Sequence, residues 1–140
     1  MIIHVVDDPS PTDVRLLDQR LDEALLRRSG HADVEHIAAL VHDDQQRLIA
    51  GASASLWGGC CEVTTLWVDE AFRGDGLGTR LLRATEGEAQ RRGCGQVVLF
   101  THCRQPPTFY LRQGYEVVGC VPDYPQGSTA VWLRKPIAVG

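Results

Sequence analysis

Apolar residues near the start of the chain recur with the spacing of a helix. Those that follow residue 10 fall three or four positions apart: Val14, Leu17, Leu21, Ala24 and Leu25. This interval gathers them on one face of a helix, which Ser10 or Thr12 would cap and Ser29–Gly30 would end. Before the helix, the run MIIHVV at residues 1–6 predicts a short strand.

Longer apolar or β-branched runs fill most of the remaining chain and predict the strands of a sheet. The expected strands cover residues 34–42, 47–57, 60–68, 96–101, 115–120 and 129–137. A second helix is expected over residues 76–92, and the segment PPTFYLRQG predicts a third, short helix. On the second helix, four residues at four-residue spacing share one face: Leu77, Leu81, Thr85 and Ala89.

The second helix joins the strands at 60–68 and 96–101, so these two strands should be parallel neighbours. The other strands should pair antiparallel. The expected fold class is therefore α+β, with a central mixed, mostly antiparallel sheet flanked by helices. The length of 140 residues, without a repeat or linker, indicates a single domain over residues 1–140.

Composition narrows the class of protein. A net charge of −4 without a basic block argues against a nucleic-acid partner. No apolar run approaches the about 18 residues of a membrane span, and the start lacks the basic region of a signal peptide, so we expect a cytoplasmic protein. Five cysteines without a CxxC spacing indicate reduced thiols rather than a disulfide framework or a metal site.

The stretch RGDGLGTR at residues 73–80 lies between a predicted strand and a predicted helix. A helix start presents unpaired N–H groups, and glycine lets the backbone approach a ligand, so this turn predicts an anion site, usually for phosphate. The candidate donors are the amides of Gly74, Gly76, Leu77, Gly78 and Thr79. Arg73 and Arg80 would add charge or brace the loop. A P-loop lysine is missing, and the GxGxG spacing fits the dinucleotide fingerprint poorly.

Two motifs together resemble one family. VDEAFRGDGLG at residues 68–78 is similar to the (R/Q)xxGx(G/A) pyrophosphate loop of the GNAT N-acetyltransferases. FYLRQGYEVVG at residues 109–119 is similar to their FYxxxGF element, and the strand–helix–strand order between the two motifs is kept. The resemblance covers about residues 47–135 and identifies the chain as a small bacterial-type member.

The resemblance implies acetyl-CoA as the donor substrate. Its pyrophosphate would lie on the amides from Arg73 to Thr79, which include Asp75. Its pantetheine arm would lie between two parallel strands that splay apart, and it would pair with the backbone near Leu66, Trp67 and Val68. Many members carry an asparagine after the next strand, where this chain has THCRQPP. Thr101, Arg104 or Gln105 would replace that contact, or the contact is absent.

Acetyl transfer needs a neutral amine, because an ammonium has no lone pair, and it releases a thiolate that benefits from a proton. By resemblance Tyr110 would be the general acid, and its alternative role is to pack the short helix. Glu62 is a candidate general base or a solvated strand residue, and His102 is the other candidate base. The amide of Val68 would stabilise the oxyanion.

Strand alternation fixes which of these side chains should share a face. It predicts two groups: Glu62, Thr64 and Leu66 on one face, and Val63, Thr65 and Trp67 on the other. Tyr115 is interpreted as a core residue. Asp123 and Tyr124 would line an acceptor pocket or simply form a turn, and Cys103 would be a passive thiol or an acetyl carrier.

The leading hypothesis is an acetyl-CoA-dependent N-acetyltransferase acting on a primary amine of a small molecule or a protein by direct attack. The alternative is a CoA-binding sensor without turnover, since the base is undefined and the loop after the fifth strand is altered. A binder of nucleotide phosphates is a third hypothesis. No metal, nucleic acid or membrane is expected to take part, and a homodimer would cover the edge strands of a small sheet.

Overall fold

The computed structural model describes residues 1–31 and 33–138. The chain divides into two compact units, residues 1–33 and residues 34–140. None of the helices in the described part of the chain is both long and apolar enough to cross a membrane.

The N-terminal unit contains one helix, α1 (Pro11–Ser29). The Ser10 hydroxyl oxygen accepts a hydrogen bond from the Asp13 N–H at 3.1 Å, so Ser10 is the cap. Gly30, with φ of 72°, ends the helix in the left-handed region. The strand predicted over residues 1–6 is wrong. The segment pairs with no strand of its own unit, and an apolar run becomes a strand only when its backbone groups find a ladder.

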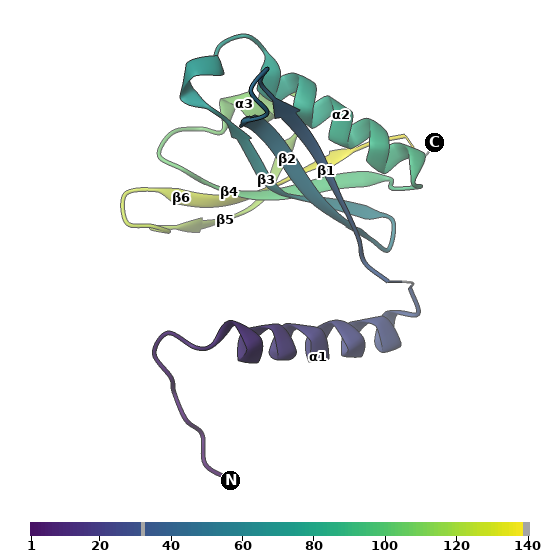
Figure 1. Cartoon of the computed structure of the whole chain (residues 1–140), viewed down its shortest axis with the longest axis vertical. Helices are drawn as coiled ribbons and strands as arrows, with labels where there is room; N and C mark the ends of the chain where they lie inside the picture. Colours follow the sequence, from purple (N-terminus) through teal and green to yellow (C-terminus); the bar gives the residue numbers. More distant parts are fainter. Residues whose placement is uncertain (32, 139–140) are drawn as a thin grey trace. The chain divides into compact units, whose positions relative to one another are not determined.

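The C-terminal unit is built on a six-stranded sheet in the order β1-β2-β3-β4-β6-β5 (Figure 1). The strands are β1 (Glu35–His42), β2 (Leu48–Trp57), β3 (Cys60–Val68), β4 (Gln96–Cys103), β5 (Glu116–Pro122) and β6 (Thr129–Pro136). Neighbouring strands run antiparallel except β3 and β4, which run parallel. The predicted mixed sheet and its parallel pair are confirmed.

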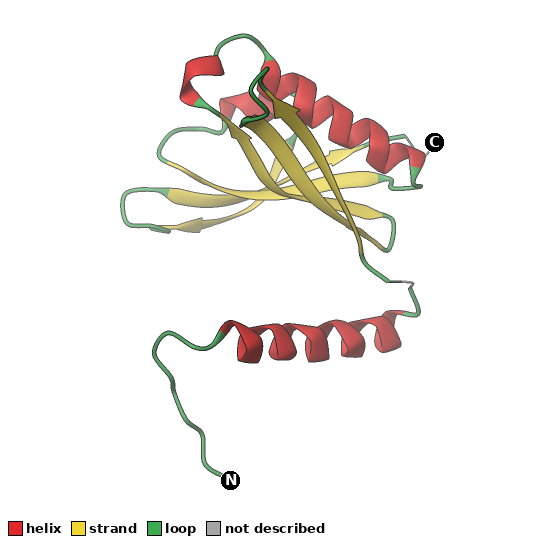
Figure 2. Cartoon of the chain, viewed as in Figure 1, coloured by secondary structure: helices red, strands yellow, loops and turns green. Residues whose placement is uncertain are grey.

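Three helical segments accompany the sheet: η1 (Glu70–Phe72), α2 (Leu77–Arg91) and α3 (Thr108–Arg112). Figure 2 shows α2 lying along one face of the sheet. The buried residues of α2 are Leu81, Leu82, Thr85, Glu86 and Ala89. The predicted apolar face of this helix is confirmed, and the buried carboxyl group of Glu86 adds to it a feature that periodicity did not predict.

Strands β3 and β4 pair over only part of their length. Their ladder ends at Val63 and Leu99, although β3 continues to Val68 and β4 to Cys103. Past the ladder, β3 stays paired with β2, and β4 stays paired with β6. The two halves of the sheet therefore diverge, as Figure 1 shows. The divergence leaves a gap near the middle of the sheet.

A β-bulge lies at the start of this gap. In the pairing of β2 with β3, Val63 is opposite Ala54, but Thr65 is opposite Ser53, so Thr64 is the extra residue. The Thr64 hydroxyl lies 3.0 Å from the Ser53 hydroxyl, within hydrogen-bond distance. A bulge shifts the alternation of side chains by one position.

This shift overturns the predicted faces of β3. Val63 belongs to a core cluster with Leu82 of α2, and Leu66 packs against a cluster that contains Leu81 of the same helix. Leu66 therefore shares a face with Val63 rather than with Glu62. The expectation assumed an unbroken strand, and the single unpaired residue reverses it from that point onward.

Candidate functional site

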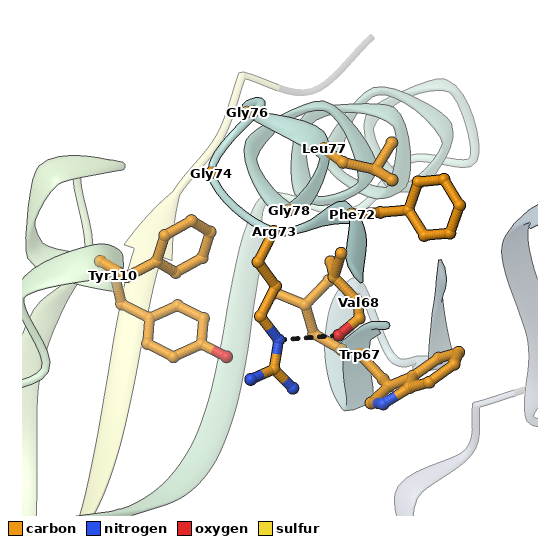
Figure 3. Close-up of a pocket in the computed structure, with 11 residues that line it drawn as sticks. Trp67, Val68, Phe72, Arg73, Gly74, Gly76, Leu77, Gly78 and Tyr110 are labelled. Carbon is orange, nitrogen blue, oxygen red and sulfur yellow. Dashed lines mark hydrogen bonds between the residues drawn. The ribbon is translucent and has the colours of Figure 1, made fainter. Parts of the chain in front are cut away.

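A cleft of about 370 Å³ lies where β3 ends and α2 begins (Figure 3). Its walls come from the end of β3, from the glycine turn before α2, and from α3. The residues that line it are Leu66, Trp67, Val68, Phe72, Arg73, Gly74, Gly76, Leu77, Gly78, Phe109 and Tyr110. Most of the residues predicted to bind the donor are thus brought together, whereas Asp75 and Thr79 do not line this cleft.

The glycine turn leaves the start of α2 open. Gly74 and Gly76 have φ of 95° and 78°, a region that L side chains rarely adopt. Gly76 is the N-cap residue and provides no side-chain cap, and the first helical hydrogen bond runs from the Arg80 N–H to the Gly76 carbonyl oxygen. The amides of residues 77–79 therefore lack a partner within the helix and suit an anion.

The backbone of β3 presents alternate residues to the gap. The Asp69 N–H donates to the Ile49 carbonyl oxygen at 2.8 Å, so the preceding pair, Val68 and Ala50, is a non-hydrogen-bonded pair of the antiparallel ladder. The N–H and C=O of Val68 therefore point away from β2. The Arg73 Nε–H donates to the Val68 carbonyl oxygen at 2.9 Å, which ties the glycine turn to the strand and leaves the Val68 N–H facing the gap.

Helix α3 stands beside the start of α2. The ring of Phe109 packs where Gly78 has no side chain, because a Cβ at Gly78 would lie 3.5 Å from it. The Gln113 Nε2–H donates to the Thr79 hydroxyl oxygen at 3.0 Å. These two contacts fix α3 against the glycine turn and so place Tyr110, on the first turn of α3, at the cleft.

A second cavity of about 280 Å³ lies in the gap between β3 and β4. Its lining residues are Val63, Thr64, Thr65, Leu66, Leu99, Phe100, Thr101 and Tyr110. Thr101, which sequence reasoning offered as a substitute for the family asparagine, is among them. Leu66 and Tyr110 line this cavity and the first cleft as well, so the two hollows meet at these side chains.

The surroundings of Tyr110 favour the neutral, protonated form of its phenol. Burial, and secondarily the nearby Cys103 thiol, raises the pKa of the Tyr110 phenol above its usual value. The phenol is therefore protonated at neutral pH. Its hydroxyl makes no hydrogen bond with the other described residues, and Figure 3 shows it projecting into the cleft together with the Arg73 guanidinium.

The neighbouring tyrosine, Tyr115, is a buried core residue that stabilises the fold. Tyr115 is 3% exposed, and its O–H donates to Glu86 Oε2 at 2.6 Å. Lys135 Nζ donates to Glu86 Oε1 at 3.0 Å, which offsets the cost of burying the carboxylate. Burial, together with the bond to Glu86, raises the pKa of Tyr115. The interpretation of Tyr115 as a core residue is confirmed.

The two candidate bases lie outside both hollows. Glu62 is exposed and sits opposite Val98, within the paired part of the parallel ladder. His102 Nδ1 lies 2.8 Å from the Tyr124 carbonyl oxygen. Because a carbonyl oxygen only accepts, Nδ1 must carry the proton, and Nε2 of a neutral His102 is then the acceptor. Neither residue is distinguished as the base by this placement.

Sequence reasoning missed the aromatic walls of the two hollows. Phe72 and Phe109 line the cleft, and Phe100 lines the gap. Phe72 directly precedes Arg73, and Phe109 directly precedes Tyr110, so both were inside quoted motifs. Phe100 lay in an apolar run that predicted only a buried strand. No three His, Cys, Asp or Glu side chains of the described residues gather as a metal site.

Comparison with known proteins identifies the family. The family model described as acetyltransferase (GNAT) matches residues 4–115. The chain belongs to the GNAT acetyltransferase family. It is 42% identical over 76 residues to the blasticidin-S acetyltransferase of Streptomyces morookaense, in a region covering 54% of this chain and 56% of that protein. The chain thus matches little more than half of this GNAT relative.

Solved structures agree with this GNAT fold. A protein of Agrobacterium tumefaciens assigned as an acetyltransferase superposes with a TM-score of 0.88 at 26% identity, covering 98% of this chain and 100% of that chain. An aminoglycoside 6′-N-acetyltransferase complexed with coenzyme A has a TM-score of 0.64 at 23% identity, and the match covers 97% of each chain. The second likeness concerns the fold alone.

Proposed function

We propose that the chain is an acetyl-CoA-dependent N-acetyltransferase that acts on a primary amine of a small molecule or a protein. The observation that carries this proposal is the position of Tyr110, which lines both the cleft at the glycine turn and the gap between β3 and β4. A donor lying along the cleft would bring its thioester to the gap, beside a neutral phenol. A module that only binds CoA has little need of that arrangement.

The donor side follows from the backbone. The CoA pyrophosphate would lie on the unpaired amides that begin α2, from Gly76 to Thr79, with Arg73 and Gly74 completing the turn. The pantetheine arm would extend past the exposed backbone edge of β3 at Leu66, Trp67 and Val68. Leu66 presents its N–H and C=O groups to the gap, and Val68 presents its N–H because Arg73 occupies its carbonyl oxygen, whereas the backbone groups of Trp67 point toward β2 by the same alternation.

The chemistry proposed at the gap is direct transfer. The neutral amine nitrogen attacks the thioester carbonyl carbon, forming the C–N bond and an oxyanion that the Val68 N–H stabilises. The C–S bond then breaks, and Tyr110 gives its proton to the leaving CoA thiolate. A relay through Cys103 is disfavoured because burial raises the pKa of its thiol, so less of the nucleophilic thiolate forms.

We propose Glu62 as the general base that takes the proton from the amine. Its carboxylate is exposed and no cation of the described residues pairs with it, so it is free to accept a proton directly or through water. His102 is the second candidate because its bond to the Tyr124 carbonyl leaves Nε2 as an acceptor. The relative named for blasticidin S supports a small-molecule acceptor.

The proposal is tested by the release of free CoA from acetyl-CoA in the presence of polyamines, aminoglycosides, amino acids or lysine peptides. We expect turnover with at least one of these amines, and a loss of about 10²-fold or more in kcat for Tyr110→Phe. CoA affinity should be unchanged, because Phe keeps the ring that packs against Phe109 and Tyr115.

Tyr115→Phe is the matched control, since it removes the same hydroxyl from the adjacent tyrosine. It should lower the free energy of unfolding by about 1–3 kcal/mol, because Glu86 loses a buried partner, with a much smaller effect on kcat. Binding of CoA without turnover on any amine would favour the sensor hypothesis. Failure to bind CoA would contradict both hypotheses.

A further inference from the structure

Four aromatic side chains gather on the sheet face opposite α2. Phe100 and His102 alternate with core residues of β4, Trp132 lies opposite Phe100 on β6, and Tyr124 belongs to the turn between β5 and β6. The Phe100 ring centroid lies 5.0 Å from the Trp132 ring centroid and 5.2 Å from the His102 ring centroid. The ring centroids of His102 and Tyr124 lie 4.7 Å apart. We call these four residues the aromatic cluster.

Hydrogen bonds hold the Tyr124 member of the aromatic cluster in place. The His102 Nδ1–H donates to the Tyr124 carbonyl oxygen at 2.8 Å. The turn itself is closed by the Tyr124 N–H donating to the Ser128 carbonyl oxygen at 3.2 Å, and by the Ser128 N–H donating to the Pro125 carbonyl oxygen at 2.8 Å. The Tyr124 side chain remains 52% exposed. These bonds fix the backbone of Tyr124, and the contact of its ring with the His102 ring preorganises the side chain to bind a ligand.

The aromatic cluster connects with the gap in the sheet. Phe100 belongs to the cluster and also lines the gap cavity, which Tyr110 lines as well. Tyr110 packs against the core cluster that includes Leu99, on the α2 side, whereas Phe100 follows Leu99 and points to the other side. The cavity therefore has walls from both faces of the sheet. A molecule resting on the aromatic cluster would reach Tyr110 through it.

The electrostatics of this face favour a positively charged ligand. Glu62 lies on the same face, since it is paired with Val98 two residues before Phe100, and Asp123 directly precedes Tyr124. The cation nearest along this face of β6 is Arg134, which is occupied by Glu116 at 3.5 Å and by Gln96 at 2.6 Å. Aromatic ring faces attract ammonium and guanidinium groups.

We propose that the aromatic cluster is the acceptor subsite, and that the acceptor carries a second cationic group, separate from the amine that is acetylated. The inference rests on the proposed function. The second cation stacks on Tyr124 and Trp132, while the amine extends past Phe100 into the gap. The aromatic cluster thus selects diamines and guanidino amines over amines with neutral tails.

Binding is tested on the full chain with CoA present by following the Trp132 indole N–H signal in NMR spectra. The probes are methylguanidinium and N-methylurea, which share one shape and differ in charge. We expect a saturable shift with methylguanidinium and a response at least about 5-fold weaker with N-methylurea. Equal responses, or none, would overturn the proposal.

Variants of Tyr124 connect this signal to the aromatic cluster. Tyr124→Leu should abolish the methylguanidinium shift, whereas Tyr124→Phe should retain it, because the ring face and not the hydroxyl makes the contact. A full shift in Tyr124→Leu contradicts the assignment. Tyr124 lies on an exposed turn, and thermal unfolding of both variants verifies that they are folded.

Turnover gives an independent readout with agmatine and N-(4-aminobutyl)urea, which carry the same amine chain and differ in the charge of the far end. We expect kcat/KM for agmatine to be about 5- to 30-fold higher in the wild type, and the two values to converge in Tyr124→Leu. Turnover without this preference would refute the subsite and leave the transferase standing. Cation binding at the cluster without any turnover would contradict the transferase and leave only a cation-binding site.

Discussion

The two sides of the gap are built from different parts of the chain. On the donor side, a continuous segment from Leu66 to Thr79 supplies backbone amides, a helix start and an arginine brace, and side-chain identity matters mainly where glycine is needed. On the proposed acceptor side, the aromatic cluster is drawn from β4, β6 and the turn between β5 and β6.

This difference explains why the donor side could be predicted as a continuous motif, whereas on the acceptor side the sequence offered only Asp123 and Tyr124, with a simple turn as the alternative. A ligand common to a family can be bound by backbone groups, whose geometry follows from a short motif. An acceptor particular to one member must be selected by side chains that tertiary structure assembles. Variants that act on one side and spare the other therefore test the comparison directly.

Among the variants that separate the two sides, the largest effect is expected for Glu62, the proposed general base on the acceptor side. Glu62→Gln should lower kcat by about 10²-fold at neutral pH, because the amine then loses its proton acceptor. His102→Asn keeps a donor in the position of Nδ1 for the Tyr124 carbonyl and removes Nε2, and it should act mainly on KM. Steady-state kinetics of the two variants decide whether Glu62 or His102 is the base. The opposite pattern would assign the base to His102.

The donor side should respond to a change of backbone conformation. Gly76→Ala places a side chain at φ of 78°, which costs about 1–2 kcal/mol and distorts the helix start that we propose binds the pyrophosphate. We expect the Kd for CoA, measured by calorimetry, to rise about 10-fold. The kcat at saturating acetyl-CoA should be nearly unchanged.

Gly87→Ala provides the control for Gly76→Ala on the same helix. A Cβ at Gly87 would meet nothing within 4 Å, and the residue is helical, so alanine should stabilise the fold by about 0.5–1 kcal/mol and leave CoA binding alone. If both substitutions weakened CoA binding equally, the effect of Gly76 would not arise from the turn.

A smaller effect is expected from the arginine brace. Arg73→Leu removes the bond from Nε to the Val68 carbonyl oxygen and a positive charge at the cleft, and we expect about 5-fold weaker CoA binding. Arg83→Leu removes an exposed arginine of α2 that makes no contact with the cleft and should have no effect. Comparable losses would indicate that overall charge, rather than the brace, controls binding.

The smallest effect on kcat is expected from a change of pH that begins to titrate Tyr110. A raised phenol pKa keeps the acid protonated beyond the ordinary value of about 10, so its proton is available throughout the neutral and mildly alkaline range. The kcat of the wild type should therefore show no alkaline decline between about pH 7 and about pH 9.5. A decline there that vanishes in Tyr110→Phe would contradict this direction of the shift.

Several features were predictable because they depend on neighbours in the chain. A cap at Ser10 or Thr12, the α2 face with Leu81 and Thr85, and the parallel order of β3 and β4 follow from spacing and from one crossover helix, and the structure selects Ser10 as the cap. The glycine turn was predictable for the same reason. Strand–turn–helix geometry is local, and its backbone requirements restrict the residue types that can occupy it.

Other features could not be predicted because they depend on long-range pairing. The bulge at Thr64 exists only in the register between β2 and β3, yet it reverses the face on which Leu66 lies. In the sequence, Glu86 is one more polar position on a helix. Only the fold buries it against Tyr115 and Lys135. Each case brings together residues that no periodicity relates.

By itself, the sequence determined the order of strands and helices from residue 10 onward, the family, and the glycine turn at the start of α2, because each follows from local spacing and turn chemistry. Tertiary structure decided that Tyr110 faces both hollows, that β3 and β4 separate after Val63, and that aromatic residues of β4, β6 and the turn between β5 and β6 come together. Strand register and helix packing set those distances, and both are fixed only when the whole sheet forms.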